Sequence, residues 1–181
     1  ACGQMRAWDE LGCRIDLAIN VSARNLHEAR LADQLEAQCR VAGVEPTRVT
    51  LELTETAAMR DAVQMMDVLT RLRVKGFQLA IDDFGTGYSS LVQLHRLPFS
   101  EIKIDRTFVT GCTTSSESRS IVRLVIELAH ALGMKAVAEE ATTRRIDREF
   151  FAAHSVTDLA GRSEYWLGQQ GRLTEPMVKR P

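Results

Sequence analysis

Two adjacent carboxylates, Asp82 and Asp83, are the side chains whose types and spacing first suggest chemistry. They follow the apolar residues 79–81, and Gly85 and Gly87 come soon after them. Neighbouring carboxylates repel each other unless a cation or a hydrogen-bond donor lies between them. An Asp pair can also form a turn and cap a helix, and for this stretch taken alone that structural role is favoured. Features elsewhere in the sequence are therefore needed to distinguish a cation site from a turn.

Polar residues also stand at the ends of the other short apolar runs. They are Asn20, Glu52, Lys103, Asp105 and Glu139. Carboxylate and amide oxygens are the ligands that Mg²⁺ and Mn²⁺ prefer, and two such ions about 3.5–4 Å apart can activate water for in-line attack on a phosphate. A lysine beside them would orient the nucleophile or neutralise developing charge. Each residue alone has a structural explanation, as a cap, a surface strand residue or half of a surface ion pair. Their repetition at strand ends favours the cation site.

The pattern of apolar residues predicts alternating helices and strands. Strands are expected at 15–22, 49–55, 78–83, 102–105 and 135–139, and helices at 1–12, 24–42, 57–75, 91–97 and 121–132. Ser89 or Ser90 is expected to cap the helix that begins at residue 91, and 110–116 is predicted as a polar loop. Roughly 24 to 34 residues separate the strand starts, a spacing typical of β-α units with parallel strands. Because parallel strands have their carboxyl ends at one edge, the polar residues should converge there.

Composition excludes several classes of protein. The 181 residues carry a formal net charge of −1, so no basic surface for a nucleic-acid polymer is expected. No apolar stretch approaches the roughly 20 residues that a membrane span needs. The four cysteines are widely spaced and form no Cys-x-x-Cys pair, which argues against a zinc knuckle or a disulfide framework. Reduced thiols in a cytoplasmic domain are the simplest interpretation.

Six segments together resemble the EAL domain family, in that family's order and at its approximate spacing. They are Asn20-Val21-Ser22, Glu52-Leu53-Thr54-Glu55, Asp82-Asp83-Phe84-Gly85-Thr86-Gly87-Tyr88-Ser89-Ser90-Leu91, Leu97-Pro98, Ile102-Lys103-Ile104-Asp105 and Ala138-Glu139. The resemblance implies an α/β fold, a TIM-like (β/α)8 barrel, of which about five to six β-α units are present here. It also implies a phosphodiesterase that uses Mg²⁺ or Mn²⁺ to open cyclic di-GMP to linear pGpG. The alternative is an unrelated barrel metalloenzyme. In that case the long Asp-Asp-Phe-Gly-Thr-Gly match would have arisen by chance.

The same resemblance implies a role for each matching residue. The metal ligands would be Asn20, Glu52, Asp82, Asp83 and Glu139. Lys103 would hold the catalytic water, Asp105 would support that site, and Glu55 would anchor the loop after Asp83. The substrate loop would comprise Phe84, Gly85, Thr86, Gly87, Tyr88 and Ser89. In the family this loop links metal occupancy to dimerisation, so a homodimer is implied, and GGDEF or sensor domains are expected in the parent chain.

Departures from the family pattern predict a weakened enzyme. The Glu-Ala-Leu signature is absent, so we expect residues 1–140 to be an EAL-like domain without its first strands. Where the family has Ala-Glu-Gly-Val-Glu, residues 138–142 read Ala-Glu-Glu-Ala-Thr. Residues 141–181 are predicted as a divergent segment, with a helix at 142–151, no clear strand and a frameshift as one hypothetical origin. The alternative function is an inactive cyclic di-GMP receptor or a protein-interaction module.

Overall fold

The computed structural model describes residues 1–60, 62–87, 90–112, 114–138 and 157–158. Their strands form one parallel sheet in which every strand pairs with its predecessor in the chain. The strands are β1 (Leu17–Asn20), β2 (Val49–Thr54), β3 (Gln78–Phe84), β4 (Glu101–Ile104), β5 (Lys135–Ala138) and β6 (Thr157–Asp158). Helices connect the successive strands, so the α/β class and the parallel order predicted from the sequence are confirmed.

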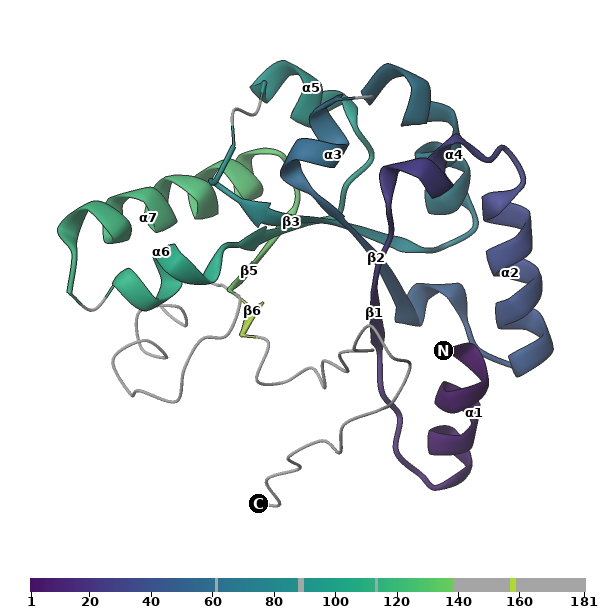
Figure 1. Ribbon diagram of the computed structural model, residues 1–181. Helices are drawn as coiled ribbons and strands as arrows, with labels where there is room; N and C mark the ends of the chain where they lie inside the picture. The colour runs from purple at the N-terminus through teal and green to yellow at the C-terminus, as the bar shows by residue number, and fades with distance from the viewer. Residues whose placement is uncertain (61, 88–89, 113, 139–156, 159–181) are drawn as a thin grey trace.

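The helices lie around the outer side of the curved sheet (Figure 1). They are α1 (Cys2–Glu10), α2 (Leu31–Ala42), α3 (Glu55–Arg60), α4 (Ala62–Val74), α5 (Leu91–Arg96), α6 (Arg106–Gly111) and α7 (Ser116–Ala131), with 3₁₀ turns η1 (Ala23–His27) and η2 (Pro46–Arg48). The core lies between the helices and the sheet. On the sheet side Leu53 and Ile81 are fully buried, as are Met65 and Leu72 of α4. Each such side chain contributes roughly 1.5–3 kcal/mol. Among the described residues, no helix combines the length and apolar character of a membrane span.

The single helix expected at 24–42 was wrong, because η1 and α2 are separate elements. Glu28, the residue after η1, has an extended backbone with φ −83° and ψ 106°. The short 3₁₀ turn directs Leu26 into the core, where it is fully buried, and η1 packs against α4. Burial of this leucine therefore outweighs the helical periodicity of the sequence. The helix expected at 57–75 is described as α3 and α4 on either side of residue 61, and α3 begins at Glu55, two residues before the expected start.

The polar loop expected at 110–116 is shorter than predicted. Helix α6 ends only at Gly111, and α7 begins at Ser116, five residues before the predicted helix start. The reason lies in two helix caps. The side chain of Asp105 accepts a hydrogen bond from the Thr107 N–H, and that of Ser115 accepts one from the Ser118 N–H. Such caps satisfy backbone donors that a helix start leaves free and so favour short polar helices. By contrast, Ser90 precedes α5 without a side-chain cap bond.

The expectation that no strand follows residue 141 is contradicted by β6. Thr157 and Asp158 pair in parallel with Val137 and Ala138 of β5. A strand of two residues is too short to show the alternation that identifies strands in a sequence, and it is defined by its pairing with β5. The helix predicted at 142–151 lies outside the described residues.

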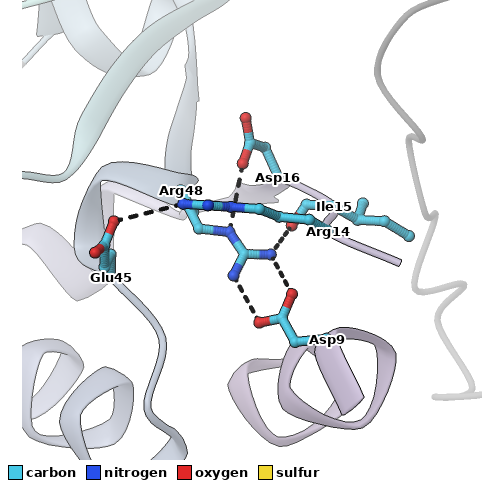
Figure 2. A network of polar contacts seen from close by, with 6 residues as sticks. All are labelled: Asp9, Arg14, Ile15, Asp16, Glu45 and Arg48. Carbon is cyan, nitrogen blue, oxygen red and sulfur yellow. Dashed lines mark hydrogen bonds and ion pairs between the residues drawn. The ribbon is translucent and has the colours of Figure 1, made fainter. Parts of the chain in front are cut away.

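A buried arginine fixes the first helix to the sheet at the start of β2 (Figure 2). Arg48 donates from Nη1 and Nη2 to the two carboxylate oxygens of Asp9 in α1, at 2.6 and 2.9 Å. It also donates to the carbonyl of Ile15 at 2.6 Å and lies 3.6 Å from Asp16. Two parallel bonds between a guanidinium and a carboxylate are both strong and directional. This contact therefore sets the position of α1 and of the segment leading into β1.

Candidate active site

The carboxyl edge of the sheet brings the predicted site residues onto neighbouring strands. Asn20, the exposed last residue of β1, is in register with Glu52 of β2. Thr54, at the end of β2, is in register with Asp82 of β3. The pairing of β1 with β2 and of β2 with β3 is parallel and has no register shift. Because these strands end at the same edge of the sheet, their oxygen-bearing side chains lie on neighbouring strands there.

Lys103 of β4 is the electrostatic centre of this edge. Its Nζ lies 2.9 Å from Glu52 Oε2 and 2.9 Å from Asp82 Oδ1, so it bridges three strands. All three side chains are buried, and the lysine is only 4% exposed. Removing such charges from water is costly, and the cost is offset here by a charge-assisted hydrogen bond to Glu52 and a close ion pair with Asp82. The surface ion pair considered for Lys103 and Asp105 is therefore wrong, because the lysine is buried and bound to other carboxylates.

Asp83 has an unusual backbone and a perturbed carboxyl group. The register between β3 and β4 shifts between Ile81 and Phe84, and Asp83 has a φ of +54°. Aspartate tolerates this left-handed region better than most residues. Burial raises the pKa of Asp83 above its ordinary value of 3.8, and the negative charges of Asp82 and Asp105 raise it further. Lys103 opposes this shift but does not cancel it. The site therefore holds a surplus of negative charge.

The loop after Asp83 is tied to the start of α3. Glu55, 2% exposed, accepts hydrogen bonds at Oε2 from the backbone N–H of Gly85 at 2.9 Å and of Gly87 at 3.2 Å. Gly85 has a φ of +104°, where any other residue is strained. The Thr86 hydroxyl donates to the Asp83 carbonyl at 2.9 Å. A buried carboxylate thus holds the loop after Asp83 by its main chain.

The structure describes some of the remaining predicted site residues and not others. Phe84 is the buried last residue of β3. Asp105 follows β4, is 9% exposed, and accepts hydrogen bonds from both the N–H (2.8 Å) and the hydroxyl of Thr107. Sequence reasoning missed Thr107, although a Thr two residues after an Asp is a recognisable cap pattern. Tyr88, Ser89 and Glu139 lie outside the described residues, so their predicted roles stay predictions.

The donor set fits a hard divalent cation in its chemistry. Glu52, Asp82, Asp83 and Asn20 all offer oxygen atoms, the ligand type that Mg²⁺ and Mn²⁺ prefer. The pKa of Asp83 is raised first by burial and then by the negative charges of Asp82 and Asp105, as expected for a carboxyl group that lies among other carboxylates. As placed, however, no three acidic, imidazole or thiol side chains in the described part of the chain surround a common point.

Comparison with known proteins identifies the family. A family model described as "EAL domain" matches residues 1–148. The chain belongs to the EAL domain family. It is 40% identical over 162 residues to the bifunctional diguanylate cyclase/cyclic di-GMP phosphodiesterase MucR of Pseudomonas aeruginosa, a match that covers 89% of this chain and 24% of MucR. The chain thus spans about a quarter of that relative. The predicted family is confirmed, whereas the predicted division near residue 140 stays a prediction.

Solved EAL structures share the fold. The structure described as "PaMucR Phosphodiesterase, c-di-GMP complex" superposes with a TM-score of 0.78 at 39% identity, covering 87% of this chain and 64% of that one. A manganese/cy-diGMP complex of Klebsiella pneumoniae BlrP1 superposes with a TM-score of 0.72 at 31% identity, covering 84% and 39%. The expected TIM-like barrel of the EAL type is therefore confirmed, and the parallel sheet seen here is a part of it.

Proposed function

We propose that this EAL domain is a metal-dependent phosphodiesterase that hydrolyses cyclic di-GMP to linear pGpG. The observation that carries the proposal is the buried Lys103 held between Glu52 and Asp82 at the carboxyl edge of the sheet. In support, the MucR relative is named a cyclic di-GMP phosphodiesterase, and the BlrP1 structure is a complex with manganese and the cyclic dinucleotide.

The proposed ligands for Mg²⁺ or Mn²⁺ come from separate strand ends. They are Asn20, Glu52, Asp82, Asp83 and Glu139. When bound, two divalent ions supply an activated water and positive charge opposite the phosphate oxygens. Glu52 and Asp82 stand on neighbouring strands of one sheet, so the backbone brings both residues to the same edge before any ligand binds. Such preorganisation avoids the cost of assembling like charges during the reaction.

Lys103 is proposed to orient the attacking water and to stabilise charge at the reacting phosphate. Its ammonium group has three donors; one bonds to Glu52 Oε2 at 2.9 Å, and the group also forms an ion pair with Asp82 Oδ1 at 2.9 Å. Because the group is buried, its field is weakly screened and acts strongly on nearby charges. Asp105 is proposed to support this position, since α6 holds its carboxylate at the end of β4.

The loop at 84–89 is proposed to contact the nucleotide. Glu55 fixes the loop's main chain, so the loop keeps its position relative to Asp83. A glycine-rich loop allows close approach of a ligand to the backbone. The further proposals are a homodimer, a cytoplasmic location, and GGDEF or sensor domains elsewhere in the parent chain. The bifunctional name of MucR supports a neighbouring cyclase domain.

The test is hydrolysis of cyclic di-GMP with either Mg²⁺ or Mn²⁺, followed by chromatographic detection of pGpG. Turnover that requires the ion and is lost in Asp82→Asn supports the proposal. A folded protein that binds the cyclic dinucleotide without forming pGpG contradicts it.

The second candidate is a receptor that binds cyclic di-GMP without hydrolysing it. Thr142 stands where the family pattern has a glutamate, and this difference favours the receptor. It also favours a weakened enzyme over a fully active one. Calorimetry distinguishes the two candidates, because the receptor gives a binding isotherm with no product. Absence of binding would leave only a protein-interaction role.

A further inference from the structure

Two cysteines that are 37 residues apart in the chain lie next to each other in the fold. The Sγ atoms of Cys2 and Cys39 are 3.7 Å apart. Cys2 is the first residue of α1, and Cys39 lies near the end of α2. The two helices pack against each other beside β1 (Figure 1). The contact is independent of the residues proposed for hydrolysis.

The position of the two sulfur atoms suits formation of a bond between them. A disulfide has an S–S length of about 2.05 Å, so the atoms need to approach by about 1.7 Å. Cys2 is partly exposed, whereas Cys39 is 1% exposed. An oxidant therefore reaches Cys2 first, with Cys39 already in contact behind it.

We propose that Cys2 and Cys39 form a reversible disulfide that ties α1 to α2 under oxidising conditions. The oxidant is a hydroperoxide. The Cys2 sulfur attacks its O–O bond to give a sulfenic acid, and water or an alcohol leaves. The Cys39 sulfur then attacks the Cys2 sulfur, and the departing hydroxyl takes the Cys39 proton to leave as water. Two thiols lose two hydrogens and two electrons, and the peroxide gains them.

The environments of the two sulfurs assign these separate roles. Burial, together with the smaller effect of the adjacent Cys2, raises the pKa of Cys39 from 9.0 to about 12. A thiol with this pKa is protonated at neutral pH and is a poor first nucleophile. Cys39 is thus the resolving thiol, and it reacts only after Cys2 has been oxidised. The pair stays reduced until an oxidant arrives.

The disulfide would close a loop that contains β1 and its terminal Asn20. Closing a loop of this length reduces the conformational freedom of the unfolded chain. For a protein of this size the expected rise in Tm is roughly 5–10 °C. Oxidation would thereby stabilise the β1 end of the sheet, which carries one of the proposed metal ligands.

The experiment treats the reduced full chain with hydrogen peroxide under native conditions, then alkylates the remaining thiols. We expect a mass loss of about 2 Da before alkylation, a cross-linked peptide pair containing Cys2 and Cys39, and the higher Tm. A reducing agent should reverse all three. Cys2→Ser should abolish them, whereas Cys13→Ser, at an exposed cysteine, should preserve them.

Three results would overturn the proposal. They are alkylation of all four thiols after oxidation, a cross-link that joins Cys13 or Cys112 instead, and a 2 Da loss that persists in Cys2→Ser at about the wild-type level. No metal or nucleotide enters the assay. Its outcome is therefore independent of whether the protein hydrolyses cyclic di-GMP.

Discussion

Lys103 Nζ lies 2.9 Å from a carboxylate oxygen of Asp82 on the neighbouring strand. The same nitrogen is equally close to Glu52, one strand further along the sheet. One buried ammonium thus compensates two buried carboxylates. Because unpaired buried charges are strongly destabilising, this arrangement couples the stability of the sheet to the proposed chemistry of the site.

Lys103→Met should therefore unfold more easily as well as lose turnover. Two carboxylates would remain buried without this cation, at a cost of about 3–5 kcal/mol in the free energy of unfolding. Urea denaturation in the presence of a chelator measures the loss. Arg123→Met is the matched control, because it also removes a positive charge but at an exposed position of α7. Its effect should stay within about 0.5 kcal/mol. Equal losses in both variants would contradict the coupling.

Gly87→Ala should displace the Glu55 carboxylate, which holds the loop proposed to contact the nucleotide. A Cβ at Gly87 would lie 3.0 Å from Glu55 Oε1 and 3.2 Å from its Cδ, closer than ordinary packing allows. We expect turnover to fall about 10-fold or more, since misplacing positioning groups by about 1 Å can cost 10²-fold. Gly3→Ala in α1 is the control, because its Cβ meets nothing within 4 Å. That change should raise stability by about 0.5–1 kcal/mol without affecting turnover.

Mn²⁺ should raise the Tm of the protein, and Asp82→Asn should remove most of that rise. At an ion concentration about 100 times the Kd, the stabilisation is about 2.7 kcal/mol, or roughly 5–10 °C. The readout is the shift caused by the ion, because the substitution also changes the stability of the apo protein. Asp67→Asn, on the exposed face of α4, should keep the full shift. An unchanged shift in Asp82→Asn would show that the ion binds elsewhere.

Acid should destabilise the protein partly through Asp9. Hydrogen bonds from Arg48 hold the pKa of Asp9 below its ordinary value of 3.8. Its contribution to stability is complete above that ordinary value and is lost as the pH falls through the lower pKa of the folded state. The Tm of wild type should consequently fall more steeply between about pH 5 and pH 2 than that of Asp9→Asn. Glu28→Gln, which removes an exposed carboxylate, should retain the wild-type slope, and parallel curves for all three proteins would refute the role of Asp9.

Much of the fold was predictable because its signals are local. Apolar runs that end in polar residues identified β1 to β5 to within a few residues, and the regular spacing indicated parallel pairing. Prediction failed where packing or capping decided the outcome. Leu26 is buried because η1 is a 3₁₀ turn and not part of a longer α-helix. The cap at Asp105 begins a helix, α6, that the sequence pattern did not predict. Strand β6 is defined by its pairing with β5.

The sequence by itself determined which residues stand at the strand ends. Each strand is recognised from a short apolar run that ends in a polar residue, and this pattern involves only residues that are adjacent in the chain. The tertiary structure alone decided their partners. Lys103 lies beside Asp82 and also beside Glu52, which is 51 residues away in the chain. Cys2 lies beside Cys39, which is 37 residues away. Such contacts depend on the order and stagger of strands and on how helices pack, and no local pattern encodes them.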